Sequence, residues 1–268
     1  MSWAGIMIRS IGKTLKLSVL ASAISILLLN CSCSMDNGTA AGHSQSSETA
    51  PVVTTSEADQ TITLTMFSST LGKEKAADNE IRELIAEKTG VKVVEIWQTG
   101  QYSRNVFDGF LESKKLADFM YFSERLDEFY EAGLLVAWDP YIEQYPNIKS
   151  LYTDEEWDML RQVDGHIYSV SIPDAPVWTG TSEEENVLCN TAGFTVTTCC
   201  KNPDIAFKFI NDILTEEIMD YRFWGIEGVD YLVDADGNCY RTQEMTENWS
   251  DVDYEIKHIC QYLMMPQS

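Results

Sequence analysis

The chain has 268 residues, of which 44% are hydrophobic and 11% aromatic, and its 42 acidic and 19 basic side chains give a formal net charge of -23. This composition is too apolar for a disordered chain, and the length suffices for a hydrophobic core. The negative field repels phosphate. It therefore argues against nucleic-acid partners and against binding an anionic membrane through basic residues.

The amino terminus has the features of a secretion signal. A basic stretch from Arg9 to Lys16 precedes an apolar run from Leu17 to Leu29, about 13 residues, which is shorter than a membrane span and typical of a signal peptide. Cys31 follows after one residue, Asn30, and resembles the lipidated cysteine of bacterial lipoproteins. We therefore predict a lipoprotein signal peptide over residues 1–30 and a lipid on Cys31.

The lipoprotein motif is imperfect, because Asn30 stands where Gly, Ala or Ser is preferred. Cys33 is an alternative lipidation site, and an ordinary signal cut or an uncleaved anchor stays open. Residues 34–58 are rich in Ser, Thr, Ala and Gly and contain no aromatic residue. This composition predicts a flexible tether, which we place at residues 31–58.

The rest of the chain shows apolar patterns of strands alternating with those of helices. In chain order, we first expect a strand at 61–67, a helix at 76–88, a strand at 91–97, a helix at 102–111 and a strand at 118–122. A helix capped by Ser123 and ending at Gly133 follows, and another begins after the Thr153–Glu156 capping box. The last elements are strands at 166–170 and 192–198 and helices from Pro203 to Ile213 and from Thr215 to Trp224. Helices between the strands imply parallel pairing and an α/β fold. Beyond Gly225 we expect a hairpin at Asp236–Gly237 and little else that packs.

Motifs for catalysis, cofactors and metals are missing. The sequence has no HExxH, no paired CxxC and no GxSxG. The stretch from Asp234 to Asn238 has its glycine at the wrong position for a calcium loop. With 42 carboxylates, a pair of acids has no specificity as a catalytic signal. We expect a protein that is not an enzyme and uses neither cofactor nor metal.

Four stretches in order resemble one family. They are residues 61–94 (ending in KTGVKVV), 116–135 (LADFMYFSERLDEFYEAGLL), 138–170 (from WDPYIEQYPNIK to DGHIYSV) and 190–231 (from NTAGFTV to GIEGVDY). Together they look like the extracellular solute-binding proteins of ATP-driven sugar importers (family 1), in particular lipoproteins of the aldouronate or oligosaccharide type. The resemblance implies a periplasmic-binding-protein-like (type II) α/β lobe, with a parallel-rich mixed sheet flanked by helices.

One departure from this family concerns the second lobe. The family inserts a long second-lobe segment after a strand like residues 166–170, whereas here only about twenty residues, 171–190, precede the next stretch. We therefore expect residues 59–225 to form lobe one, residues 226–268 to be a residual hinge or second-lobe tail, and the second lobe to be largely missing. An internal deletion and a naturally short form both stay open.

The resemblance places ligand at loops after the carboxyl ends of the lobe-one strands. The candidate ligand-binding residues are Ser68, Ser69, Phe122, Glu124 and Arg125, with Trp178 and Trp224 as further aromatic platforms. Aromatic faces stack on pyranose rings, and charged or hydroxyl groups bind sugar hydroxyls. For Phe122 a core position is the alternative, for Glu124 and Arg125 a solvated first helical turn, and for both tryptophans simple packing.

The resemblance thus implies a substrate-binding component of an ABC importer for carbohydrates, lipid-anchored on the extracytoplasmic face of the cell membrane. Its partners would be a carbohydrate ligand, ABC permease subunits and, through the N-terminal lipid only, the bilayer. The alternative is a non-transporting remnant or interaction module, with a folded lobe one and little ligand affinity.

Overall fold

The computed structural model describes residues 61–69, 72–98, 103–171 and 192–267. The predictions for residues 1–60, including the signal peptide and Cys31, lie outside these ranges, as does Trp178. Of the helices in the described ranges, none combines the length and the apolar character needed to cross a bilayer.

A four-stranded sheet organises the fold, in the order β2-β1-β3-β4. Its strands are β1 (Ile62–Ser68), β2 (Val91–Trp97), β3 (Phe119–Phe122) and β4 (Gly193–Val196). The central strand β1 pairs in parallel with β2 and with β3, whereas β4 is antiparallel to β3. The expected α/β fold with a parallel-rich mixed sheet is confirmed.

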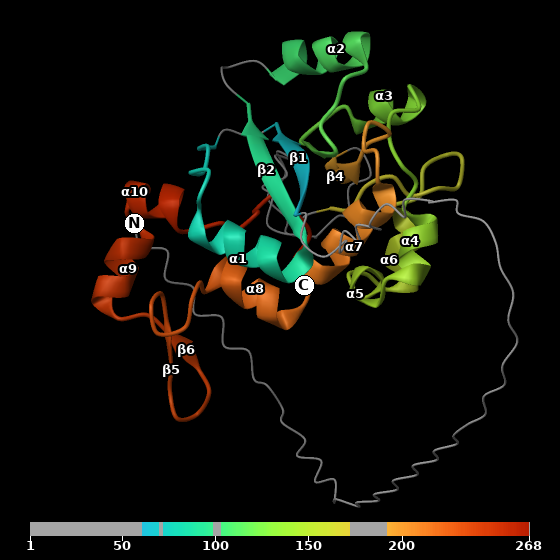
Figure 1. Ribbon diagram of the computed structural model, residues 1–268. Helices are drawn as coiled ribbons and strands as arrows, with labels where there is room; N and C mark the ends of the chain where they lie inside the picture. The colour runs from blue at the N-terminus through green and yellow to red at the C-terminus, as the bar shows by residue number, and fades with distance from the viewer. Residues whose placement is uncertain (1–60, 70–71, 99–102, 172–191, 268) are drawn as a thin grey trace, which may run out of the picture. The chain divides into compact units, whose positions relative to one another are not determined.

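Ten helices and a small hairpin surround this sheet in the described residues (Figure 1). They are α1 (Glu80–Thr89), α2 (Ser103–Ser113), α3 (Leu126–Glu131), α4 (Asp139–Gln144), α5 (Pro146–Lys149), α6 (Asp154–Met159), α7 (Pro203–Ile213), α8 (Glu216–Phe223), the hairpin β5 (Leu232–Val233) and β6 (Cys239–Tyr240), α9 (Gln243–Trp249) and α10 (Val252–Lys257). The hairpin and the Thr153–Glu156 capping box are confirmed.

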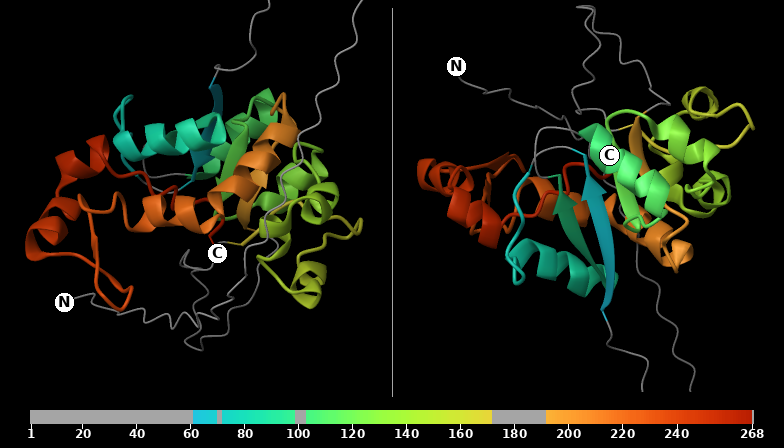
Figure 2. Two further views of the ribbon diagram at one scale, coloured as in Figure 1. Left: turned by 60° about the horizontal axis from the view of Figure 1, so that its bottom comes forward. Right: turned by 90° about the horizontal axis from the view of Figure 1, so that it is seen from above.

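The sheet has a hydrophobic cluster on each face, because successive side chains of a strand point to opposite faces. On one face Met66 and Phe119 pack with residues of α1, α7 and α8. On the other face Phe67, Met120 and Phe122 pack with residues of α2 and α3. The views in Figure 1 and Figure 2 show these two groups of helices on either side of the sheet.

Three local predictions are wrong. Residues 166–170 do not form a strand; they are irregular, and Val170 alone makes a β-bridge, to Phe194. Helix α3 is not capped by Ser123, because the residue before it is Arg125, which has a left-handed backbone (φ 64°) and no side-chain cap. Helix α1 begins later than expected, after Asn79, whose side chain accepts a hydrogen bond from the backbone of Arg82.

The expectation that little beyond Gly225 packs is also wrong. Residues 256–266, which we call the C-terminal segment, contribute Ile259, Cys260, Tyr262 and Met265 to the buried core, none more than 1% exposed. The hydroxyl of Tyr262 donates to the backbone carbonyl of Val93 on β2 at 3.2 Å. The C-terminal segment is therefore part of the packed lobe.

Candidate functional site

The ends of β1, β2 and β3 lie together because the three strands are parallel. We call this region the carboxyl edge; it comprises Ser68 and Ser69 after β1, Trp97 and Gln98 at the end of β2, and residues 122–125 after β3. In open α/β sheets, loops at this edge of parallel strands commonly bind ligands. The sequence-derived candidates from the first and third strands are therefore neighbours in the structure.

Hydrogen bonds join the three strand ends. The hydroxyl of Ser69 is 3.2 Å from that of Ser123 and also accepts from the Ser123 backbone N–H at 3.1 Å. The backbone N–H of Gln98 donates to the carbonyl of Ser68 at 3.1 Å. Ser69 and Gln98 are each 8% exposed, whereas Ser123 is exposed. At the carboxyl edge, hydrogen bonds thus hold the three strand ends together, and the polar groups there are hydroxyls and amides.

Phe122 lies in the core rather than at this surface. It has no exposed area, and its ring centroid is 4.5 Å from that of Phe129 and 5.4 Å from that of Phe107. A ring covered by two other rings offers no face to a sugar. The core position, considered above as the alternative, describes Phe122 in this structure, and the role of platform does not.

Arg125 and Glu124 differ in their surroundings. Glu124 is exposed at the carboxyl edge. The guanidinium of Arg125 turns toward helices α2 and α3, where it contacts Asp108 at 2.8 Å and Glu128 at 2.5 Å. Its hydrogen bond to Glu128, and to a smaller extent that to Asp108, raises the pKa of Arg125 above its usual value. These ion pairs brace the start of α3.

Trp224 is partly buried and lies at the end of α8. The guanidinium of Arg241 lies 5.0 Å from the centroid of its ring, and the ring of Tyr231 is 5.7 Å away. Arg241 also donates to the backbone carbonyl of Trp224 at 2.9 Å. This packing matches the alternative considered for Trp224 in the sequence.

Sequence reasoning overlooked the end of β2. The indole Nε1 of Trp97 is buried and has no hydrogen-bond partner among the described residues. Gly72 lies against this ring so closely that a Cβ there would be 2.2 Å from Trp97 Cδ2, which requires glycine at that position. The rule that placed ligand groups after the first and third strands applies equally to the second. It would have added Trp97 and Gln98 as candidates.

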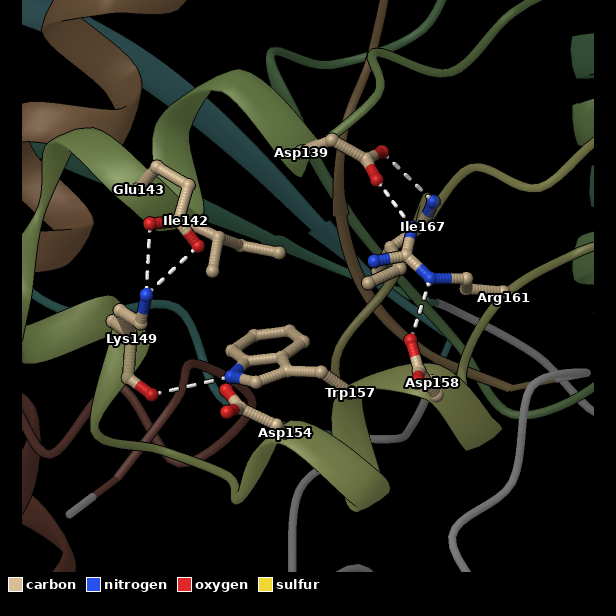
Figure 3. Close-up of a pocket in the computed structure, with 9 residues that line it drawn as sticks. All are labelled: Asp139, Ile142, Glu143, Lys149, Asp154, Trp157, Asp158, Arg161 and Ile167. Carbon is tan, nitrogen blue, oxygen red and sulfur yellow. Dashed lines mark hydrogen bonds and ion pairs between the residues drawn. The ribbon is translucent and has the colours of Figure 1, made fainter.

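A hollow with a volume of about 310 Å³ lies among α4, α5 and α6 (Figure 3). Its lining comprises Asp139, Ile142, Glu143, Lys149, Asp154, Trp157, Asp158, Arg161 and Ile167. Ile167 precedes the bridge at Val170, and the bridged chain runs in the direction of β3. The hollow therefore lies toward the amino ends of the parallel strands, away from the carboxyl edge.

Ion pairs occupy much of this hollow. Lys149 contacts Glu143 at 2.7 Å, and Arg161 contacts both Asp139 and Asp158. Burial raises the pKa of Asp139, but hydrogen bonds from the backbone of Ile167 and from Arg161 bring it below its usual value. The indole of Trp157 donates to the carbonyl of Lys149 at 3.1 Å, and the residue is only 4% exposed. Most of the polar side chains that line the hollow are therefore paired with other protein groups.

In the described ranges, no group of three or more His, Cys, Asp or Glu side chains is placed to hold a metal ion. The carboxyl edge combines serine hydroxyls, a carboxamide and the exposed carboxylate of Glu124. Such groups can hydrogen-bond the hydroxyls of a neutral polar ligand. This edge is the site with the clearest chemical character.

No family model matches the chain, and no curated protein matches it. Solved structures do. An extracellular solute-binding protein from Bifidobacterium longum subsp. infantis is 10% identical with a TM-score of 0.55, over 80% of this chain and 78% of that one. The alginate-binding protein AlgQ2 is 12% identical with a TM-score of 0.54, over 76% and 81%.

A third structure, the solute-binding protein associated with an HMO-binding ABC transporter from Bifidobacterium longum infantis, is 9% identical with a TM-score of 0.52, over 78% of each chain. Identities this low relate the chains by fold alone. The described part of the chain has the α/β fold of periplasmic-binding-protein-like solute-binding proteins.

Proposed function

We propose that this chain is the substrate-binding component of an ABC importer for carbohydrates. The observation that carries this proposal is the solute-binding-protein fold together with the hydrogen-bonded polar groups at the carboxyl edge of its parallel strands. There the hydroxyl of Ser123 and the carboxylate of Glu124 are exposed, whereas Ser69 and Gln98, each 8% exposed, lie behind them. The proposed role is binding without catalysis, since no pair of acids stands out as a proton donor and nucleophile.

The proposed ligand class is an oligosaccharide. Similar structures include a protein named for alginate and an N-glycan transport solute-binding protein from Streptococcus pneumoniae in complex with Man5GlcNAc, the latter with a TM-score of 0.51. Within this class we propose the aldouronate or complex-oligosaccharide type, on the sequence resemblance. The net charge of -23 disfavours acidic sugars unless a basic group faces the site.

We further propose that the chain is held at the extracytoplasmic face of the cell membrane by a lipid on Cys31. Residues 1–30 would be the signal peptide, 31–58 the tether and 59–225 lobe one, which the packed C-terminal segment completes. Only residues 226–255 would then remain as the residual hinge. The apolar run before Cys31 supports the signal peptide, and the Ser, Thr, Ala and Gly content of residues 34–58 supports the tether. A lipid and a flexible tether would keep the lobe near permease subunits while leaving it free to reorient.

The proposal includes a largely missing second lobe. In the described ranges, the strands build one four-stranded sheet and one short hairpin, and the carboxyl edge belongs to that single sheet. Fewer than thirty residues lie between the bridge at Val170 and strand β4. If the carboxyl edge lacks a facing wall, the alternative role is a remnant or interaction module with little affinity for sugar.

Saturation-transfer NMR on the purified protein tests the binding role, since it detects weak complexes. Neutral oligosaccharides should receive saturation and uronate-containing ones less of it, and Ser123→Ala and Glu124→Ala should each weaken the transfer. Asp154→Ala, in the hollow among α4, α5 and α6, is the matched control and should leave it unchanged. Absence of transfer to every sugar would favour the remnant alternative, and transfer lost only in the control would move the site to that hollow.

A further inference from the structure

His258 connects two carboxylates that come from distant parts of the chain. Its Nδ1 is 2.6 Å from Oε2 of Glu80 at the start of α1, and its Nε2 is 2.9 Å from Oδ2 of Asp230, which follows α8. An ionised carboxylate only accepts hydrogen bonds, so both ring nitrogens donate to these partners when the ring is an imidazolium. The side chains of His258 and Asp230 are 8% and 1% exposed, whereas that of Glu80 is 59% exposed.

The groups facing this imidazolium come from three elements. Besides Glu80 and Asp230, the ring of Tyr254 on α10 lies 4.6 Å from the His258 ring. The Tyr254 hydroxyl donates to Oδ1 of Asp230 at 2.7 Å, and the backbone N–H of Ile226 donates to Oδ2 at 2.7 Å. Asp230 is therefore fixed as an ionised acceptor, and His258 is its partner of opposite charge.

The same place joins the C-terminal segment to the beginning of α1. The backbone N–H of Ile81 donates to the carbonyl of His258 at 3.2 Å. The amide of Asn79 donates to the carbonyls of Ile256 and Ile259, both at 3.0 Å. These bonds do not titrate near neutral pH, whereas the His258 ring, which contacts α1 through Glu80, does.

We propose that His258, Glu80 and Asp230 form a pH-sensitive latch, which holds the C-terminal segment against α1 and the edge strand β2 when His258 is charged and weakens when it loses its proton. Deprotonation leaves one ring nitrogen as an acceptor facing a carboxylate. It therefore replaces an attraction by a repulsion on one side. The latch goes beyond ligand binding and does not depend on the proposed function.

The direction of the pH dependence follows from the two partners. The hydrogen bond to Asp230 raises the pKa of His258 above its usual value, although burial opposes this. Burial raises the pKa of Asp230, but hydrogen bonds from His258 and the Ile226 backbone bring it below its usual value. The contribution of His258 is complete below its unfolded pKa of about 6.5 and is lost as the pH rises through its raised folded pKa.

A second buried group faces the same segment. Glu95, on β2, is 6% exposed and lies among Lys75, Arg82 and Arg222, and its charge acts on Cys260 and Tyr262 of the C-terminal segment. Burial raises its pKa to about 7. Its ionisation also weakens the folded state as the pH rises, so a test of His258 must remove this contribution.

Hydrogen exchange followed by mass spectrometry tests the latch. Exchange is measured at a series of pH values from about pH 6 to about pH 9, in wild type and in a Glu95→Gln background, and corrected for intrinsic exchange rates. In that background, residues 256–266 and the first turn of α1 should lose roughly tenfold protection at the higher pH. His258→Asn should give the lower protection at both pH values.

Two further variants complete the experiment. His166→Asn makes the same change at an exposed histidine that contacts Asp139 at 3.3 Å and should leave the pH dependence unchanged. Glu80→Gln removes only the exposed carboxylate and should shift the loss of protection to lower pH, which keeps the test valid if His258→Asn does not fold. Equal protection at both pH values, or an unchanged pH dependence in Glu80→Gln, would overturn the proposal.

Discussion

Arg222 on α8 donates to the backbone carbonyl of Tyr262 at 2.9 Å, and neither residue is more than 1% exposed. The same guanidinium donates at 2.9 Å to the carbonyls of Gln261 and Pro266. Burial lowers the pKa of Arg222 to about 10, so it stays charged at neutral pH. One buried cation thus satisfies several carbonyls of the C-terminal segment.

Arg222→Met should therefore destabilise the protein strongly. The substitution keeps much of the apolar stem but leaves buried carbonyls without donors, at a cost on the order of 3 kcal/mol. Urea denaturation followed by circular dichroism measures the loss. Arg161→Met, which removes ion pairs at a partly exposed site, should have a much smaller effect. Equal stability of wild type and Arg222→Met would show that the C-terminal segment is not held in this way.

Phe122→Ala should also destabilise the fold, because the ring is fully buried between Phe107 and Phe129. Loss of a buried phenylalanine side chain costs about 3–5 kcal/mol. The midpoint of thermal unfolding should fall accordingly, while Val163→Ala, at a residue 97% exposed, should leave it nearly unchanged. A stable Phe122→Ala protein with reduced sugar binding would restore the role of platform.

The sequence predicted the four strands of the sheet because their apolar patterns are local, whereas the strand predicted at residues 166–170 does not form. The alternation in residues 61–67 and the run at 118–122 are sufficient to identify β1 and β3. The sequence could not show that the ring of Phe122 is buried, because its burial depends on packing against Phe107 of α2. Nor could it predict the left-handed backbone of Arg125, which moves the start of α3. The helix α1 was shortened for a similar reason, since Asn79 caps it and binds the C-terminal segment.

The C-terminal segment was the largest error in the sequence-based description. Its apolar residues Ile259, Cys260 and Tyr262 are too few and too close together to show a helix or strand period. Their burial depends on partners such as Asn79 and Arg222, distant in the chain. Of the candidate site, the carboxyl edge followed from the order of the strands. The direction of the Arg125 side chain depended on ion pairs with α2 and α3.

Glu95→Gln should stabilise the protein above neutral pH. The ordinary pKa of Glu is about 4.5, and burial raises that of Glu95 to about 7, so the folded state loses stability as the pH rises between these values. The loss is on the order of 3 kcal/mol above pH 7, and the isosteric amide removes it. Urea denaturation at a series of pH values should show a flatter profile for Glu95→Gln.

Glu87→Gln is the control for this prediction, because Glu87 is an exposed acid on α1. It makes the same chemical change without removing a buried charge. Its stability profile should follow that of wild type across the same pH range. If the profile of Glu95→Gln also follows that of wild type, ionisation of Glu95 does not reduce the stability of the folded state.

Lipidation at Cys31 predicts incorporation of a fatty-acid analogue in cells that express the chain. Label should be present in wild type and in Cys33→Ala, and absent in Cys31→Ala. The matched pair differs only in which thiol of the Cys31-Ser32-Cys33 sequence remains. Label that survives Cys31→Ala and disappears in Cys33→Ala would move the site to Cys33. Wild-type protein without label would exclude the lipoprotein assignment.

The last prediction concerns binding strength. A two-lobed solute-binding protein contacts its ligand from both walls and excludes water between them. A protein with a 1 μM dissociation constant has a binding free energy of about -8 kcal/mol, so a single wall with half of it binds at about millimolar. An open site also keeps its water, which weakens the contacts further. We therefore expect calorimetry with neutral oligosaccharides to show dissociation constants near millimolar or no measurable heat.

Variants at the carboxyl edge show whether this weak binding belongs there. Ser123→Ala should weaken it further, because Ser123 is exposed and its hydroxyl lies beside that of Ser69. Arg125→Ala should act mainly on stability, through its contacts with Asp108 and Glu128. If Arg125→Ala instead abolishes binding of uronate-containing sugars without loss of stability, the guanidinium faces the ligand. Micromolar binding to any sugar would contradict the single-wall argument and imply that a second wall is present.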